Sequence, residues 1–251
     1  MDLKLAGKIA LVAGGARGCG LAISQELARE GVKVLLTGRH ADIVEAAVKA
    51  IRDEGGVVEG LVGEMDSEAG ARAMVQRTRE AFGDPGILVF NPPSPRLVDS
   101  WENIDLEDYD DAHRKFSMAL VYLLREMVPA MKANRWGRVI NVSSIVKTPH
   151  LHSPMYHHNM RVASVSITKT LSFEMARFGI TANSISPGAF RSALSAEYLD
   201  RLGQSEAVVE MHTPMQRMGL PEEMAGWSRS SVPTGRPSSA VRQSASTAAP
   251  R

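Results

Sequence analysis

The sequence predicts an α/β fold, a single doubly wound parallel sheet with helices on both faces. Short apolar runs alternate with longer amphipathic stretches along most of the chain, which is the pattern of strand–helix–strand units. A glycine-rich turn joins the first apolar run to the first amphipathic stretch. No linker rich in Pro, Gly and Ser divides the first 220 residues, so we expect one domain.

Six apolar runs are the predicted strands: Ile9–Ala13, Val32–Thr37, Val57–Val62, Ile87–Phe90, Arg138–Val142 and Thr181–Ser186. Between them, apolar residues recur at helical spacing in five segments: Leu21–Glu30, Ile43–Glu54, Glu68–Phe82, Leu106–Lys132 and Met160–Arg177. Right-handed crossovers between parallel strands then place ligands at the carboxyl ends of the strands.

Composition favours a small-molecule partner. Lys and Arg number 29 against 28 Asp and Glu, a formal charge of +1, so no global field attracts nucleic acid or an anionic membrane. The apolar run near the N-terminus is too short to span a membrane and lacks a cleavage-site pattern. The single cysteine, Cys19, excludes an internal disulfide and fits a reducing compartment. We therefore expect a cytoplasmic protein.

The turn after the first predicted strand reads AGGARGCG and carries Gly14, Gly18 and Gly20. Glycines let the backbone approach a pyrophosphate closely, and the N-terminus of the following helix offers N–H donors and a positive dipole end. Between a strand and a helix, this spacing predicts a dinucleotide-binding loop.

Two arginines favour NADP(H) over NAD(H), although NAD(H) stays possible. The second predicted strand ends in LLTGRH, so Arg39 stands where an NAD-specific site usually has an acidic residue. Arg17 lies inside the glycine loop. Guanidinium groups bind a ribose 2′-phosphate well, whereas a surface location without a ligand is the alternative for either residue.

Four segments together resemble the short-chain dehydrogenase/reductase family, in particular its 3-oxoacyl-carrier-protein-reductase-like members: AGGARGCG, GRVINVSS, TKTLSFEMARFGITANSISPG and TPMQRMGLPEEMA. The resemblance covers about residues 5 to 226 and implies a Rossmann fold, a nicotinamide cofactor and a homodimer or homotetramer. It implies hydride transfer between the nicotinamide and a small-molecule carbonyl or alcohol. Family members use a Tyr as proton donor, a Lys beside it, a Ser on the carbonyl oxygen and an Asn for a water relay.

The catalytic positions depart from this pattern. Counting back from TKTLSFEMARFG puts Arg161 at the Lys position and His157 at the Tyr position, and Ser144, thirteen residues before His157, falls on the Ser position. Tyr156 is then one place off, a rotation of about 100° on a helix. Shifting the register to use Tyr156 would put Met160 in the Lys role, which a thioether cannot perform.

Further positions follow from the same resemblance. Counting back from Pro129 puts Phe116 at the position of the relay Asn. Asn91 is retained after the fourth strand, and Pro187 and Gly188 match the family's cofactor-binding turn after the sixth. The segment from Ala189 to Met218 would form the substrate lid.

Three interpretations of the altered centre are open. In the first, His157 acts as the acid and Arg161, four residues on along the same helical face, supports it, with the imidazole pKa lowered by the neighbouring cation. In the second, the protein binds a dinucleotide without turnover, as a sensor or assembly subunit. The third is a metal site of four histidines, His150, His152, His157 and His158, but its spacing matches no usual zinc site, so we expect no metal. We favour the first.

The chain changes character after Gly226. Residues 1–226 form the predicted domain, and 227–251 form an aberrant tail rich in Ser, Arg, Pro and Ala that we expect to be disordered. Read from the third base of each codon, the tail permits VAFLGSDRAAIECGQAIRVDGGTP, an apolar helix followed by the strand and turn that the family would have there. We infer a one-base frame displacement near Gly226, which resequencing the DNA tests.

The chain as written should then lack its last strand and leave the sixth strand as an unpaired edge. Because the lost segment contributes to subunit contacts in the family, the homo-oligomer is expected only for an intact C-terminus.

Overall fold

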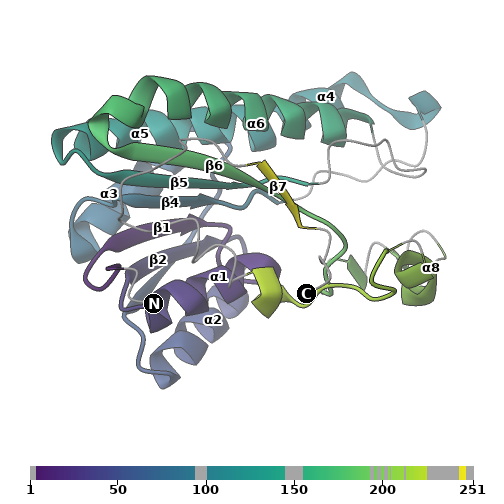
Figure 1. The fold of residues 1–251 in the computed structure, drawn as a ribbon, viewed down its shortest axis with the longest axis horizontal. Helices are drawn as coiled ribbons and strands as arrows, with labels where there is room; N and C mark the ends of the chain where they lie inside the picture. Colours follow the sequence, from purple (N-terminus) through teal and green to yellow (C-terminus); the bar gives the residue numbers. More distant parts are fainter. Residues whose placement is uncertain are drawn as a thin grey trace.

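The computed structural model describes residues 4–93, 101–144, 155–192, 195–196, 199–200, 203, 205–211, 213–224 and 243–246. Its strands are β1 (Ile9–Ala13), β2 (Lys33–Gly38), β3 (Val58–Val62), β4 (Ile87–Phe90), β5 (Gly137–Val142), β6 (Ile180–Pro187) and β7 (Gln243–Ser246). They form one sheet in the order β3-β2-β1-β4-β5-β6-β7 (Figure 1). Every neighbouring pair is parallel.

Helices cover both faces of this sheet (Figure 1). On one face lie α1 (Gly18–Arg29) and α2 (Ala41–Asp53), and on the other lie α3 (Glu68–Phe82), α5 (Ala119–Ala133) and α6 (Met155–Met175). The chain between β4 and α5 also forms α4 (Leu106–His113), and α8 (Glu206–Met211) follows β6. The predicted three-layer α/β architecture is confirmed.

The period-two alternation of the strands explains why both faces are covered. On β1, Ala10 and Val12 pack toward α1 and α2, whereas Leu11 and Ala13 pack toward α3 and α5. All four side chains have no exposed surface. Because a parallel strand buried on both faces must be apolar throughout, IALVA forms a central strand rather than an edge.

Helix ends follow local sequence signals. Ser67 precedes α3, and its hydroxyl accepts a hydrogen bond from the N–H of Gly70 at 3.0 Å. Asp105 precedes α4, and its N–H donates to the Asp108 carboxylate at 3.1 Å. These side chains accept hydrogen bonds from backbone N–H groups at the start of each helix, which have no partner within the helix itself.

The predicted helix Leu106–Lys132 is interrupted by one π-helical turn, Arg114–Met118, between α4 and α5. Phe116 lies inside this turn and is fully buried. A π-turn inserts a residue into the helical ladder and often marks a functional site. The apolar periodicity carried no sign of it, because the residues on either side keep the same buried face.

The expectation that β6 would end the sheet as an unpaired edge is wrong. Residues Gln243–Ser246 form β7, which pairs in parallel with β6 from Ser184 to Pro187. Strand pairing uses backbone N–H and C=O groups, and the sequence QSAS contains no proline that would remove a donor. The rest of 225–251 lies outside the described residues, so the disorder predicted for the tail stays a prediction.

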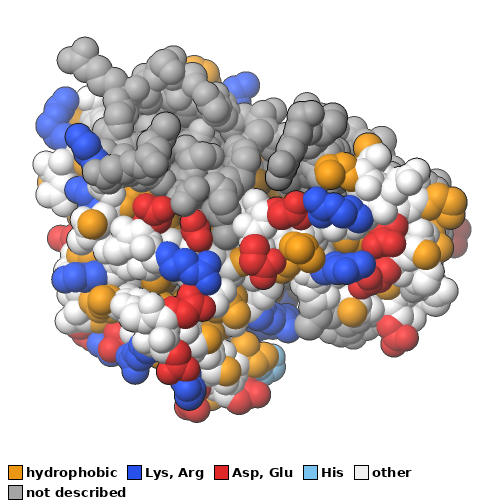
Figure 2. Space-filling model, turned by 60° about the horizontal axis from the view of Figure 1, so that its bottom comes forward, with side chains coloured by type: hydrophobic (Ala, Val, Ile, Leu, Met, Phe, Trp, Pro, Cys, Tyr) orange, Lys and Arg blue, Asp and Glu red, His pale blue; other side chains and the backbone are white. Residues whose placement is uncertain are grey.

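On the face drawn in Figure 2, the described basic and acidic side chains are interspersed, with hydrophobic side chains between them. This mixture agrees with the near-zero net charge. Within the described part of the chain, no helix has the length and apolarity needed to cross a membrane.

Candidate active site

The glycine loop meets the end of β4 at the carboxyl edge of the sheet. The Asn91 side chain donates from Nδ2 to the carbonyl oxygen of Gly14 at 2.9 Å, and the Asn91 N–H donates to the Ala13 carbonyl at 2.9 Å. A side chain on Gly14, whose φ is +81°, would overlap the Asn91 carbonyl oxygen. A Cβ on Gly20 would lie 2.6 Å from Asn91 Nδ2. Glycine is therefore required at both positions.

The loop is also tied to β2 and α1. The Gly14 N–H donates to Thr37 Oγ1 at 3.1 Å, and Ser24 Oγ donates to the carbonyl of Gly20 at 2.9 Å. The helix starts at Gly18, so its first N–H groups open toward the carboxyl edge between β1 and β4. This edge is where the strand order reverses direction, the usual ligand site of an open α/β sheet. The structure thus brings Gly14, Gly18, Gly20 and Asn91 to this edge, and their role in cofactor binding stays a prediction.

The segment after β6 reaches the same loop. Pro187 ends β6, Gly188 follows it, and a Cβ on Gly18 would lie 3.7 Å from the Cβ of Ser192. Backbone bonds from Gly219 to Ala189 and from Arg191 to Gly219, at 2.9 and 2.8 Å, hold this segment beside residues 213–219. Two carboxylates of α8, Glu206 and Glu210, pair with Arg191 at 3.2 and 3.1 Å. The described part of the expected lid is anchored at its base.

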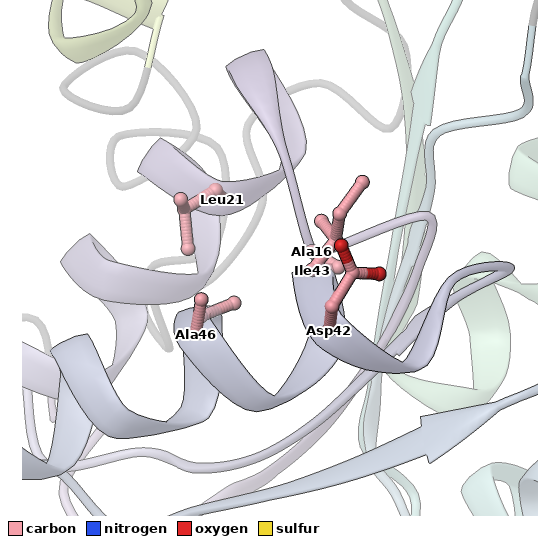
Figure 3. A pocket seen from close by; sticks show the side chains of 6 residues that line it. Ala16, Leu21, Asp42, Ile43 and Ala46 are labelled. Carbon is pink, nitrogen blue, oxygen red and sulfur yellow. The ribbon is translucent and has the colours of Figure 1, made fainter.

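Arg17 and Arg39 are both exposed. Arg17 directly precedes α1, and Arg39 follows β2. Between these two segments lies a pocket of about 360 Å³, lined by Ala16, Leu21, Asp42, Ile43, Ala46 and Ala47. In Figure 3, Leu21 of α1 and Ala46 of α2 face one another across it, while Ala16, Asp42 and Ile43 lie together. Its lining is apolar apart from Asp42.

Cys19 is half-buried in the first turn of α1. Burial raises the pKa of its thiol to about 11. The group therefore stays protonated at neutral pH and is not a nucleophile of this site.

Ser144 follows the end of β5, and buried contacts fix the backbone leading to it. The Ser143 N–H donates to the Ile185 carbonyl of β6 at 2.8 Å. Asn141 of β5 is fully buried, and its Nδ2 donates to Ser164 Oγ and Thr168 Oγ1 of α6, both at 3.1 Å. The end of β5 is thereby held to β6 on one side and to α6 on the other. Ser144 itself is half-buried.

Arg161 of α6 lies against this same end of β5. Its Nη1 donates to the carbonyl oxygens of Ser143 at 2.7 Å and Val142 at 3.3 Å. Its guanidinium carbon stands 4.5 Å from the ring centroid of Phe116. Burial lowers the pKa of Arg161 to about 10. The two positions at which the family would have its Lys and its relay Asn are thus in direct contact here.

Tyr156 and His157 lie in the first turn of α6, on the same helix as Arg161. Their side chains, like that of His158, lie outside what the structure describes, as do His150 and His152 altogether. The roles predicted for Tyr156 and His157 therefore stay predictions. Among the described residues, no group of three His, Cys, Asp or Glu side chains could hold a metal ion.

Sequence reasoning missed two parts of the site, the Asn141 network and the stacking of Arg161 on Phe116. A signal for the second was present. In the register that the family resemblance implies, Arg161 and Phe116 take the positions of the Lys and the relay Asn, whose usual side chains cooperate in one relay. When two residues that normally act together are both replaced, a contact between the two new side chains is expected.

Comparison with known proteins shows the family of this chain. The sequence profile of the family described as short chain dehydrogenase matches residues 8–202. The chain is 29% identical over 223 residues to a 3-oxoacyl-(acyl-carrier-protein) reductase of Pseudomonas aeruginosa, with 89% of each sequence covered. It is 28% identical to dehydrogenase/reductase SDR family member 4 of Oryctolagus cuniculus, over 88% of this chain and 85% of the relative.

Among solved structures, L-sorbose reductase from Gluconobacter frateurii, complexed with NADPH and L-sorbose, superposes with a TM-score of 0.89 at 26% identity. The match covers 98% of this chain and 97% of that one. The family profile spans all the sequence-predicted site residues, from Gly14 to Gly188.

Proposed function

We propose that this chain, which belongs to the short chain dehydrogenase family, is an NADP(H)-dependent oxidoreductase that interconverts a carbonyl and an alcohol by hydride transfer. The observation that carries the proposal is the cradle at the carboxyl edge of β1 and β4. Gly14, Gly20 and Asn91 leave no room for side chains there, and the N-terminus of α1 opens onto it. Such a cradle suits the pyrophosphate of a dinucleotide.

Residues around the cradle would hold the cofactor. Backbone N–H groups at Gly18 and Gly20 would bind the pyrophosphate, and Pro187 and Gly188 would border the nicotinamide end. Exposed Arg17 and Arg39 would bind the 2′-phosphate, which favours NADP(H) while leaving NAD(H) possible. The NADPH bound by L-sorbose reductase, a 26% identical neighbour, supports this preference.

When bound, a nicotinamide dinucleotide supplies or accepts the hydride of such a reaction. The chain supplies the remaining groups. Ser144 at the end of β5 orients the carbonyl by donating a hydrogen bond to its oxygen, and His157 donates the proton as the alcohol forms. Arg161 replaces the family Lys as the cation of the site, so the catalytic centre is atypical.

Two further expectations belong to this proposal. A homodimer or homotetramer would cover the exposed apolar side chains of α6, Val162 at 48% and Phe173 at 68% exposure, provided the C-terminus is intact. A cytoplasmic location fits the cysteine usage.

A reduction assay tests the chemistry. NADPH oxidation is followed with a panel of one ketone, one 3-oxoacyl thioester and one aromatic polyketide, using the wild type, His157→Ala and Tyr156→Phe. We expect His157→Ala to lower kcat by about 10²-fold, the usual loss on removing a general acid. Tyr156→Phe should stay within about twofold, because the register that puts His157 at the Tyr position places residue 156 about 100° away around the helix.

The opposite pattern, loss of activity in Tyr156→Phe alone, would contradict the assignment of His157. NADPH binding without turnover of any carbonyl would instead support a dinucleotide-binding protein without catalysis.

A further inference from the structure

Arg161 is hydrogen-bonded to the backbone immediately before Ser144. The two carbonyl groups that accept from its Nη1, those of Val142 and Ser143, are the last two before Ser144. The carbonyl of Arg161 in turn accepts from Ser164 Oγ at 2.8 Å, and Ser164 is bonded to Asn141. The guanidinium is therefore part of the buried frame between β5 and α6, and any shift of it moves the backbone at Ser144.

Phe116 holds the other side of this guanidinium. The ring is fully buried in the π-helical turn and packs with Ala112, Ile104, Tyr109 and Met160. A cation that stacks on an aromatic face without water around it is stabilised by the electrostatic attraction of the ring. Burial lowers the pKa of Arg161 only to about 10, so the group keeps its charge at neutral pH. A permanent positive charge is thus fixed behind Ser144.

We propose that Arg161 and Phe116 are a positioning pair that fixes the end of β5 and holds a permanent positive charge behind the Ser144 hydroxyl. The inference rests on the proposed function for the reaction that the pair serves, since Ser144 must donate to an oxygen that becomes negative. A fixed cation beside a donor strengthens that donation without reorganisation. Phe116 has no proton to relay, so the π-helical turn acts through Arg161 alone.

A reporter thiol at the site measures this charge directly. Ser144→Cys is made together with Cys19→Ser, which leaves one cysteine in the chain. The rate of alkylation by iodoacetamide as a function of pH gives the pKa of the new thiol. The elements around this site carry other titratable groups: Asp108, Tyr109, Asp111, His113 and Lys115 on α4 and the π-helical turn, and Tyr156, His157 and His158 in the first turn of α6. The curve is therefore fitted mainly between pH 7 and 9.5.

We expect Arg161→Met to raise the pKa of the reporter thiol by about one unit, a tenfold fall in alkylation rate at pH 7. Arg161→Lys keeps a charge but not the planar contact with the ring, so the thiol pKa should rise by less than half as much. Phe116→Leu should give a smaller rise as well, because the guanidinium loses the surface that locates it.

Arg138 provides the matched control at the opposite end of β5. It is also buried, with its pKa lowered to about 10, and its Cζ stands 4.9 Å from the Trp136 ring. Its Nη1 donates to the carbonyls of Gly137 and Gly179 at 2.7 and 2.9 Å. Arg138→Met should cost similar stability yet leave the reporter thiol unchanged.

Equal thiol pKa values in the Arg161→Met and Arg138→Met proteins would overturn the inference. If Arg161→Met does not fold, the other variants decide. In that case, the inference is overturned if the reporter thiol has the same pKa in Arg161→Lys, in Phe116→Leu and in the protein that keeps both Arg161 and Phe116. The measurement needs neither cofactor nor substrate. If the protein does not bind NADPH but Arg161→Met raises the thiol pKa, only the proposed function is contradicted. If the protein reduces a carbonyl but Arg161→Met leaves the thiol pKa unchanged, only this inference is contradicted.

Discussion

Single residues of the phosphate loop carry the strongest constraint in this molecule. Gly14 combines a left-handed backbone, with φ of +81°, and a close approach to the Asn91 carbonyl. Either condition alone favours glycine, and both together require it. The spacing of Gly14, Gly18 and Gly20 predicted a glycine turn between β1 and α1, and the structure has this turn. The contact of Asn91 with Gly14 depends on the fold and could not be derived from the loop alone.

Gly14→Ala should abolish dinucleotide binding and lower the free energy of unfolding by about 3 kcal/mol. About 1 kcal/mol comes from the left-handed backbone, and the rest from the overlap with Asn91. Urea unfolding and a nucleotide titration measure the two effects.

The control is Gly55→Ala. Gly55 has nearly the same backbone, with φ of +84°, but nothing within 4 Å of an added Cβ. It should lose only about 1 kcal/mol and bind nucleotide normally. Equal losses in the two variants would show that the close approach to Asn91 does not matter.

At the scale of elements, the amphipathic periods predicted where strands and helices lie, and β1, α3 and β4 match residue for residue. Two features had no periodic signal. The π-helical turn around Phe116 preserves the buried face of its helix, so the apolar pattern passes through it unchanged. The hydrogen bonds from Asn141 to α6 join residues 23 and 27 positions apart in the sequence, so no local sequence pattern predicts them.

Asn141→Ala should lower the free energy of unfolding by about 2–3 kcal/mol. Ser164 Oγ and Thr168 Oγ1 donate their protons to helix carbonyls at 2.8 Å, so their lone pairs depend on the Asn141 amide. In Asn141→Ala these two buried hydroxyl oxygens would have lost the N–H donor of Asn141.

Ser184→Ala is the comparison for this network. The Ser184 hydroxyl is also buried but lies 3.5 Å from Asn141 Nδ2, at the limit of a hydrogen bond. Urea unfolding should show a loss below about 1 kcal/mol. If Ser184→Ala lowers the free energy of unfolding as much as Asn141→Ala does, the loss comes from changing a buried side chain and not from the hydrogen bonds of the Asn141 amide.

At the scale of the whole molecule, the parallel strand order brings four separate segments to one edge. The ends of β1, β4, β5 and β6 are neighbours in the sheet, so Gly14, Asn91, Ser144 and Pro187 converge although 173 residues separate the first from the last. Fold class and this convergence followed from the sequence, because a doubly wound sheet leaves little choice of topology. The seventh strand did not, since QSAS has no apolar pattern.

The frame displacement near Gly226 stays a prediction. In the alternative reading of the tail, the letters IRVD fall on residues 243–246, the same four that form β7. The alternative reading predicts a strand at these four positions, and it supplies the apolar residues that a strand buried against helices requires.

The central claim is that the glycine cradle binds NADP(H), and a fluorescence titration of the purified protein with NADPH and NADH tests it most directly. We expect binding of NADPH at micromolar or lower concentration, at least about tenfold tighter than NADH, with the preference lost in Arg39→Ala because the 2′-phosphate loses its cation. Folded protein that binds neither nucleotide would contradict the account.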